Sequence, residues 1–280
     1  MSKRSKKLTY ERKLSEGRGV GHGKEYKPWI VIQDFPSKGR VSRIKGLKTQ
    51  RQHEFLSDLE RNYFYYLEAS TNVIDIREQF PLLPLEETLL IAKKMGIKHP
   101  IDPQTKEPIV MTTDFLITIK TEDGEIKELA RTLKYKDELL QKRIVEKFEL
   151  ERLYFENRGI NWGIVTDQEV DKQLAQNLAD IHAYYDLAEI EAFATMKLWE
   201  VQELIDVFLE CCVTYKESLR SMCIQFDKAM SLEKGSGITL FKHLLWAKLI
   251  AIDLTKAINW SEHIDISIND KSLSKGAEIG

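Results

Sequence analysis

Three side chains that could cooperate in hydrolysis lie in three separate predicted elements of the first half of the chain. Glu60 lies in a predicted helix over residues 53–70, Asp114 begins a predicted strand, and Lys134 stands near the end of the strand that follows it. Two carboxylates can hold Mg²⁺, a hard cation that prefers oxygen ligands and keeps several of its waters. A bound metal lowers the pKa of a water molecule, and a nearby ammonium can stabilise a charged transition state. These residue types therefore predict metal-dependent phosphodiester hydrolysis.

The position of Glu60 has two interpretations. Leu56, Leu59 and Tyr63 follow helical spacing and define the inward face of the predicted helix, and Glu60 falls inside that stripe. A carboxylate on the packed side is costly unless a metal or a cation pairs with it. The alternative is a capping box, in which Ser57 begins the helix and Glu60 reaches back to its start. Apolar residues before Ser57 favour an earlier helix start, but the sequence leaves both interpretations open.

The other two residues lie in a predicted hairpin. The segment TTDFLITIKTEDGEIKELARTLKYK, residues 112–136, reads as two strands joined by a Glu-Asp-Gly-Glu turn. Side chains alternate along a strand, so Thr132 and Lys134 share one face, and Asp114 begins the neighbouring strand. The hairpin can bring Asp114 close to Lys134. The alternative is an ordinary hairpin with charged ends.

The elements that would position these residues form a mixed α/β unit over residues 1–167. Besides the hairpin, the predicted strands cover residues 29–35, 40–46, 73–84 and 160–167. The predicted helices cover residues 53–70, 85–96 and 136–159. The last two helices end in glycine, as helices commonly do.

The chain changes character from residue 168 onward. It becomes mostly helical through about Met230, and then contains a glycine-rich turn, EKGSG. A further helix, ITLFKHLLWAKL, and two short β-like segments, IAIDL and HIDISI, follow. Helices followed by a small terminal hairpin predict a winged-helix-like domain over residues 168–280.

Charge is unevenly distributed along the chain. The formal net charge is −2, but residues 1–53 contain 15 Lys and Arg against 4 Asp and Glu. A basic segment of this kind suits contact with the phosphates of nucleic acid, and a solvated tail is the alternative.

The cysteines and the apolar segments exclude several classes of protein. Two of the three cysteines, Cys211 and Cys212, are adjacent and Cys223 stands alone, so the sequence predicts neither a zinc site nor a disulfide framework. The basic N-terminus MSKRSKKLTYERK is not followed by an apolar segment, and we expect no signal peptide. The longest apolar stretch, LLWAKLIAIDL, is too short to span a bilayer. These features predict a cytoplasmic protein with no membrane partner.

Several blocks of the first domain occur in an order that is more specific than the three residues alone. They are EGRGVGHGKEYKPW, LSDLE, VIDIREQFPLLP, GIKHP, MTTDF, the lysine Lys134, EKFELER and WGIVTD. In this order they resemble the TnsA family, the endonuclease subunits of Tn-seven-like heteromeric transposases. The resemblance runs from about Glu16 to Asp167, and the rest of the chain matches in length and helical character.

The resemblance implies a fold for each part of the chain. It implies a restriction-endonuclease-like fold for residues 1–167 and a winged-helix fold for residues 168–280. Glu60, Asp114 and Lys134 match the catalytic glutamate, aspartate and lysine of the family.

One position departs from the family pattern. The family often carries a glutamine, a metal ligand, two residues before the lysine, and this chain has Thr132 there. Thr132 would ligate the metal through a water, or the carbonyl of Leu133 would carry more of the coordination. Glu151 aligns with a glutamate implicated in the family's activity, although a solvated surface role is equally compatible with its charged helix.

The basic residues just before the catalytic helix are the predicted contacts to the DNA backbone. They are Arg43, Lys45, Lys48, Arg51 and His53.

The resemblance implies a specific reaction. We expect Mg²⁺-dependent hydrolysis, with Mn²⁺ as a substitute, of the 5′ strand in double-stranded DNA at the transposon ends. An integrase-type transposase subunit would cut the other strand, and an ATP-using regulator would control activity at the bacterial nucleoid. Two alternatives stay open: a catalytically weak DNA-binding assembly factor that bridges transposase and regulator, and a stand-alone restriction-like nuclease.

Overall fold

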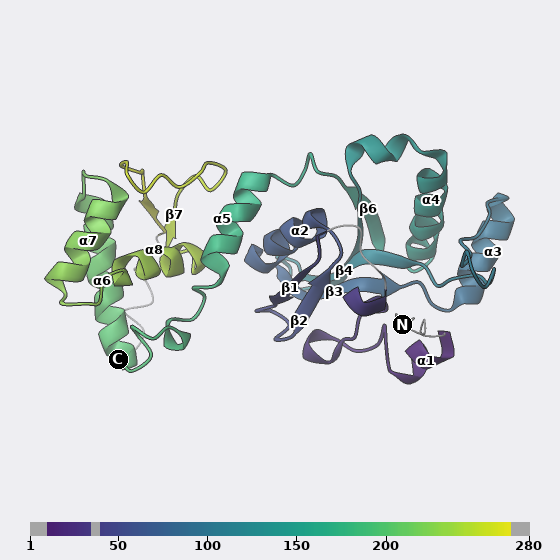
Figure 1. Cartoon of the computed structure of the whole chain (residues 1–280), viewed down its shortest axis with the longest axis horizontal. Helices are drawn as coiled ribbons and strands as arrows, with labels where there is room; N and C mark the ends of the chain where they lie inside the picture. The colour runs from purple at the N-terminus through teal and green to yellow at the C-terminus, as the bar shows by residue number, and fades with distance from the viewer. Residues whose placement is uncertain (1–9, 35–39, 270–280) are drawn as a thin grey trace, which may run out of the picture. The chain divides into compact units, whose positions relative to one another are not determined.

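The computed structural model describes residues 10–34 and 40–269 of the 280-residue chain. The first nine residues of the basic segment, and Phe35 at the end of one predicted strand, lie outside the described residues. The chain divides into two compact units, with the boundary between Val170 and Asp171. Figure 1 shows the elements of each unit.

The larger unit is built on a four-stranded mixed sheet, in the order β3-β4-β5-β6 (Figure 1). Strands β3, β4 and β5 are antiparallel, whereas β5 and β6 are parallel because helix α4 forms the crossover between them. The strands of the sheet are β3 Val73–Pro81, β4 Thr112–Lys120, β5 Ile126–Leu133 and β6 Asn161–Val165. A separate antiparallel pair consists of β1 Ser42–Lys45 and β2 Gln52–Phe55. The mixed α/β class predicted for this part of the chain is confirmed.

Helices of the larger unit pack on both faces of this sheet. They are α2 Asp58–Ala69, α3 Leu85–Met95 and α4 Lys142–Glu156, whereas the short helix α1 Tyr10–Ser15 has no buried residue. Consecutive side chains of β4 enter two different hydrophobic clusters, because side chains alternate along a strand. Phe115 packs with Phe64 of α2, whereas the adjacent Leu116 packs with Leu150 and Phe155 of α4. The sheet is therefore buried between α2 on one face and α3 and α4 on the other (Figure 1).

Three predicted boundaries of the larger unit were wrong. The helix predicted from residue 53 begins at Asp58, because Gln52–Phe55 forms a strand that pairs with β1 and buries alternate side chains. The strand predicted over 29–35 is replaced by the 3₁₀ turn Ile32–Asp34, in which the Asp34 carboxylate accepts a hydrogen bond from the Val31 amide at 3.2 Å.

The long helix predicted over residues 136–159 is divided. It consists of the 3₁₀ turn Lys136–Leu140 and helix α4, which begins at Lys142. Gln141 separates the two with an extended backbone, φ −80° and ψ 115°. The division matters because the 3₁₀ turn directly follows Lys134.

The smaller unit is mostly helical, as the sequence predicted. Its helices are α5 Lys172–His182, α6 Leu198–Thr214, α7 Leu219–Ala229 and α8 Ser236–Trp246, with a 3₁₀ turn at Leu187–Glu189. A two-residue antiparallel pair follows, β7 Ile250–Ala251 and β8 Ser267–Ile268. Helices α7 and α8 approach closely at Gly237, where a Cβ atom would lie 2.8 Å from the Cys223 carbonyl oxygen. The buried carboxylate of Asp227 accepts the amide N–H groups of Gly235 and Gly237 and so fixes the start of α8.

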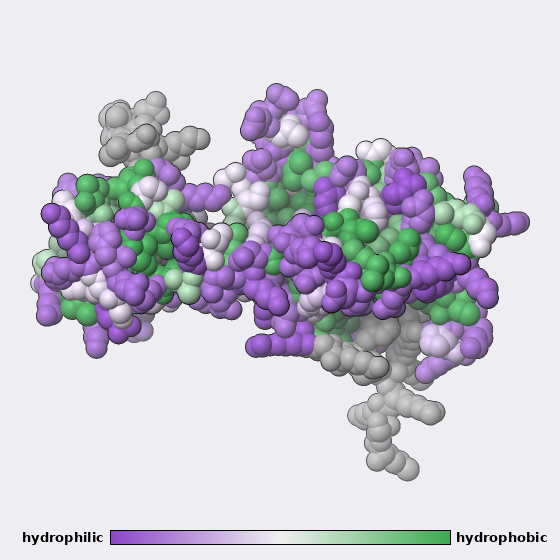
Figure 2. Space-filling model, turned by 90° about the horizontal axis from the view of Figure 1, so that it is seen from above, coloured by the Kyte–Doolittle hydropathy of each residue, from purple (hydrophilic) through white to green (hydrophobic). Residues whose placement is uncertain are grey.

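The surface of the described chain is mixed (Figure 2), and its cysteines are not paired. Hydrophilic side chains cover much of the face of each unit in Figure 2, with smaller hydrophobic patches between them. Cys211, Cys212 and Cys223 are free thiols. None of the helices within residues 10–34 and 40–269 is both long enough and apolar enough to cross a membrane.

Candidate active site

Glu60 lies in the first turn of α2 and is both a capping residue and a buried carboxylate. Its Oε1 atom accepts a hydrogen bond from the Ser57 hydroxyl at 2.8 Å, and its Oε2 atom accepts the Leu56 amide N–H at 3.1 Å. The Ser57 hydroxyl in turn accepts the Glu60 amide N–H at 3.2 Å, so Ser57 caps the helix and Glu60 reaches back to its start, one residue beyond the position of a standard capping box. The side chain is nevertheless inward, and the residue is 8% exposed. The two interpretations of this glutamate are therefore compatible.

Asp114 lies near the start of β4 and accepts two hydrogen bonds. Its Oδ2 atom accepts the Leu133 amide N–H at 2.6 Å, and its Oδ1 atom accepts the Gln79 side-chain amide at 3.3 Å. Burial raises the pKa of Asp114 to about 6, although the Leu133 and Gln79 hydrogen bonds and the Lys134 charge act in the opposite direction. Asp114 is therefore still ionised in part at neutral pH, although its carboxylate is buried.

The structure brings Glu60 and Asp114 together. Burial raises the pKa of Glu60 to about 8, and the negative charge of Asp114 is the second cause. Hydrogen bonds from Leu56, Ser57 and Gln79 reduce this rise without cancelling it. Burial raises the pKa of both carboxyls, and the charge of Asp114 raises that of Glu60 further, so a bound cation would be favoured here because buried charges are costly.

Lys134 follows the last residue of β5 and lies beside this pair. Its charge lowers the pKa of Asp114, but its ammonium is bound directly to Glu138, with Nζ 2.6 Å from Oε2. Glu138 belongs to the 3₁₀ turn that follows the strand. The lysine side chain is 30% exposed, so the ammonium is accessible from solvent.

Glu151 is a third buried carboxylate of the same region. It lies on α4, is 5% exposed and accepts the Thr132 hydroxyl at 2.5 Å. Burial raises the pKa of Glu151 to about 8, the Thr132 hydrogen bond opposes the rise, and the charge of Asp114 adds to it. A solvated surface role for Glu151 is therefore wrong.

Thr132, the residue that departs from the family pattern, is already fully engaged. Besides donating to Glu151, its hydroxyl oxygen lies 3.0 Å from the Thr113 hydroxyl and accepts the Trp162 indole N–H at 3.1 Å. This arrangement anchors Glu151 to the sheet and leaves Thr132 little capacity to hold another group.

The donor set suits a hard divalent cation. The anionic groups of the site are the carboxylates of Asp114 and Glu60, and carboxylate oxygens are ligands that Mg²⁺ and Mn²⁺ accept. Within the part of the chain that the structure describes, no three Asp, Glu, His or Cys side chains form a complete metal cage. Mg²⁺ commonly binds through one or two carboxylates and keeps several waters, so Glu60 and Asp114 would be sufficient protein anions.

Gln79 is a site residue that the sequence reasoning missed. It lies on β3, is 4% exposed and contacts Asp114. The available signal was the run Arg77-Glu78-Gln79, in which three consecutive polar residues interrupt the alternation of a strand. All three side chains are buried, so the run marks a polar interior.

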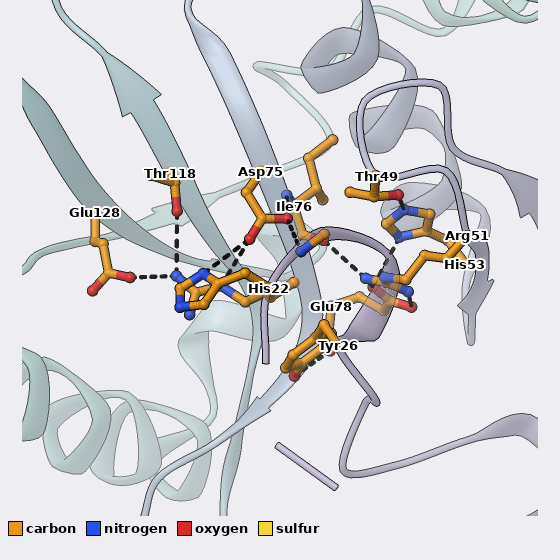
Figure 3. Close-up of polar contacts among 12 residues, drawn as sticks. His22, Tyr26, Thr49, Arg51, His53, Asp75, Ile76, Glu78, Thr118 and Glu128 are labelled. Atoms are coloured by element: carbon orange, nitrogen blue, oxygen red, sulfur yellow. Dashed lines mark hydrogen bonds and ion pairs between the residues drawn. The ribbon is translucent and has the colours of Figure 1, made fainter. Parts of the chain in front are cut away.

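The residue before Gln79 forms the centre of a separate buried network (Figure 3). Glu78 is fully buried and binds both the Arg51 guanidinium and the His53 imidazole, with His53 Nδ1 2.8 Å from the carboxylate. The other ring nitrogen of His53 lies 2.7 Å from the Thr49 hydroxyl. Burial favours the neutral acid, but His53 and Arg51 together lower the pKa of Glu78 to about 2.

This network corrects part of the predicted DNA interface. Arg51 and His53 are buried against Glu78 and cannot present their charges to a phosphate backbone. The Lys48 ammonium donates to the carbonyl oxygens of Ser70 and Val73, both at 2.7 Å, and so joins the end of α2 to β3. The sequence could not separate these residues from surface cations because all lie in one basic run.

Arg43 and Lys45 are the predicted DNA contacts that remain on the surface. Both are exposed on β1, and they alternate with the half-buried Ile44, so their side chains share one face of the strand. Arg43 forms an ion pair with Glu54 at 2.9 Å.

Comparison with known proteins identifies two matching family models and a similar protein. Residues 70–167 match a model described as TnsA-like endonuclease N terminal, and residues 169–254 match one described as TnsA endonuclease C terminal. The transposon Tn7 transposition protein TnsA of Escherichia coli is 36% identical over 258 residues, which cover 92% of this chain and 90% of that protein.

Proposed function

We propose that this chain hydrolyses the 5′ strand at each transposon end with Mg²⁺. It belongs to the TnsA family and is the DNA endonuclease subunit of a Tn7-like transposase. Mn²⁺ would substitute for Mg²⁺. We divide the chain into a catalytic domain over residues 1–167 and a C-terminal domain over 168–280.

The observation that carries the metal-dependent part of the proposal is the uncompensated pair Glu60 and Asp114. Burial raises the pKa values of both carboxyls, and the charge of Asp114 adds to the rise for Glu60. A divalent cation bound by Glu60 and Asp114 would neutralise their charge, polarise the scissile phosphate and lower the pKa of an attacking water. Glu60 is held by the helix start and Asp114 by the Leu133 amide, so both ligands are fixed by the backbone.

The remaining residues of the site have separate tasks. Lys134 would orient the attacking water or stabilise the charge that develops on the phosphate, because its charge acts on Asp114. Glu151 and Thr132 would hold the end of β5 against α4, so that Thr132 acts on a metal only through water. Leu133 would contribute its carbonyl oxygen, while its amide N–H supports Asp114.

DNA would reach the site along the basic surface of β1. Arg43 and Lys45 are exposed there, and their charges suit contact with phosphates. An integrase-type transposase subunit would cut the other strand and join the ends, and an ATP-using regulator would license the reaction. We place this activity at the bacterial nucleoid, in the cytoplasm, where its DNA substrate lies.

The smaller unit would provide the docking surface or an additional contact to DNA. Its helices α6, α7 and α8 are followed by the short pair β7 and β8, an order that supports a winged-helix-like domain. Leu198 and Trp199 at the start of α6 are 91% and 61% exposed, which is unusual for large apolar side chains.

The decisive experiment is strand cleavage in the reconstituted transposase complex with end-labelled transposon DNA and Mg²⁺ or Mn²⁺. The wild-type chain should release the 5′ strand, and Asp114→Ala should not, while joining by the partner subunit continues. Equal nicking by both proteins would refute the assignment. Joining without any 5′-strand nick by the wild-type chain would favour the assembly factor, and efficient cleavage by the purified chain alone would favour a stand-alone nuclease.

A further inference from the structure

Gln79 has a backbone conformation that its residue type does not favour. Its φ angle is +48°, in the left-handed region, where a side chain is strained and glycine is preferred. It lies within β3 between Glu78 and Phe80, which pair with Phe115 and Thr113 of β4. This register places Gln79 opposite Asp114. Strained residues of this kind persist when the surrounding structure holds them, and they cluster at functional sites.

The side chain of Gln79 points its amide nitrogen at Asp114 and also acts on Glu60. Its Oε1 atom accepts the Thr112 hydroxyl at 3.2 Å, which fixes the orientation of the carboxamide. Its Nε2 atom donates to Asp114 at 3.3 Å, and the same side chain lowers the pKa of Glu60. The carboxamide nitrogen carries two N–H donors, so one remains for Glu60.

The backbone of Gln79 is held from the side opposite the site. The N-terminal segment over residues 16–34 crosses β3, and the Trp29 amide donates to the Gln79 carbonyl oxygen at 3.2 Å. The Tyr26 hydroxyl donates to the carbonyl oxygen of Glu78 at 3.0 Å, and the Glu78 side chain is fixed by Arg51 (Figure 3). The conformation of Gln79 is therefore imposed by its neighbours on the chain.

We propose that Gln79 is a positioning residue of the metal site, whose neutral carboxamide holds Glu60 and Asp114 in the arrangement that binds a divalent cation. A neutral donor can restrain two like-charged groups without competing with the cation for their charge. Thr132 cannot replace it, because the Thr132 hydroxyl is occupied by Glu151, Thr113 and Trp162. This inference rests on the proposed function.

The test is Mn²⁺ binding by the full chain, followed by the electron paramagnetic resonance signal of the free ion. Gln79→Gly relieves the left-handed backbone and removes the carboxamide, and we expect Mn²⁺ affinity to fall about 10- to 100-fold, as for other supporting residues of metal sites. The melting temperature should stay equal or rise. Gln79→Asn tolerates the left-handed conformation, keeps a shorter carboxamide and should recover part of the affinity.

Gln50 provides a matched control. It is also a glutamine with a left-handed backbone, φ +55°, but it is exposed and its side-chain amide donates to the Leu47 carbonyl oxygen. Gln50→Gly should bind Mn²⁺ as the wild-type chain does.

The outcomes separate the inference from the proposed function. If Gln79→Gly binds Mn²⁺ as tightly as the wild-type chain while Asp114→Ala loses binding, the role of Gln79 is refuted and the metal site stands. If the wild-type chain binds no more Mn²⁺ than Asp114→Ala, both the metal site and the role of Gln79 are refuted.

Discussion

Two buried carboxylate clusters lie side by side in the larger unit and are organised in opposite ways. Glu78 is surrounded by cationic partners, Arg51 and His53, and its pKa is lowered to about 2. Glu60 is surrounded by neutral donors and faces Asp114, and its pKa is raised to about 8. Both residues are glutamates with little exposed surface. Their charge partners, and not their burial, distinguish them.

The charges next to a buried carboxylate distinguish a structural carboxylate from a functional one in the same domain. A buried ion pair satisfied by its own chain holds the fold, and removing one partner leaves an uncompensated charge. A buried carboxylate with only neutral and like-charged neighbours reduces stability, and such groups are typical of sites that bind or transform a ligand. Residues Glu78 and Gln79, adjacent on β3, join the two clusters.

The largest expected effect is the loss of cleavage on neutralising Glu60. Glu60→Gln keeps the shape of the side chain and removes one metal ligand, so 5′-strand cleavage in the reconstituted complex should fall on the order of a thousand-fold, the equivalent of several kcal/mol of metal stabilisation. Stability should not fall, because the repulsion from Asp114 is relieved. Gel quantification of 5′-strand product and calorimetry measure the two effects.

Glu68 is the matched control for Glu60. It is another buried glutamate of α2, and it accepts the Leu47 amide N–H at 2.7 Å. Glu68→Gln should leave the cleavage rate close to that of the wild-type chain. Similar losses for the two variants would mean that Glu60 acts through the helix and not through the metal.

The second effect is the loss of stability on neutralising Glu78. Glu78→Gln leaves the Arg51 guanidinium buried without its counter-charge, and we expect the free energy of unfolding of the larger unit to fall by about 3 kcal/mol. Calorimetry of the full chain measures the shift of that transition. An unchanged unfolding transition would show that the Glu78 network does not stabilise the fold. Glu78 would then not be a structural carboxylate.

The sequence predicted the parts of this comparison that depend on local pattern. The hairpin of β4 and β5, the glycine-ended helix α3 and the inward position of Glu60 all follow from periodicity and turn residues. The capping arrangement of Ser57 and Glu60 is equally local, but it was underrated because Phe55 and Leu56 resembled helix residues. Phe55 instead ends β2, where it pairs with Ser42 at the start of β1.

The rest of the site depends on contacts that no local pattern contains. Arg51 and His53 were predicted to contact DNA because they lie in a basic run, yet their partner Glu78 lies on a different strand. The run Arg77-Glu78-Gln79 signals a polar interior, but it does not single out Gln79, because the role of a glutamine in a strand depends on its backbone and partners. The engagement of Thr132 with Glu151 likewise needed the packing of α4 on β5.

The third prediction is that the two clusters give opposite dependences of stability on pH. The pKa of Glu60 is raised in the folded state. Its contribution to the free energy of unfolding is therefore fully present below the unfolded-state pKa of 4.5, and it is lost as pH rises towards about 8. The folded-state pKa of Glu78 is lowered, so its contribution is present above 4.5 and is lost as pH falls towards about 2.

Melting temperatures of the metal-free chain measured across these two windows test the signs. Between pH 5 and 8, the melting temperature of the wild-type chain should decline with pH. Glu60→Gln should make this decline shallower, because the carboxyl group with the raised pKa is absent. Below pH 4.5, Glu78→Gln should flatten the acid-side loss. If Glu60→Gln leaves the slope of melting temperature against pH unchanged between pH 5 and 8, the carboxylate pair does not titrate as the structure indicates.

The smallest expected effect concerns Lys134, the cation whose charge acts on Asp114. Its ammonium is paired with Glu138, in a partly exposed ion pair that is worth about 0 to 1 kcal/mol. Glu138→Gln frees the ammonium to approach Asp114, and the cleavage rate of the complex should rise by up to about five-fold, the equivalent of that energy. Glu149→Gln, which breaks an exposed pair with Arg152 on α4, should leave the rate unchanged. A fall in the cleavage rate for Glu138→Gln alone would show that Glu138 holds Lys134 in its working position. Lys134 would then resemble Glu78, whose charge is balanced by side chains of the same chain.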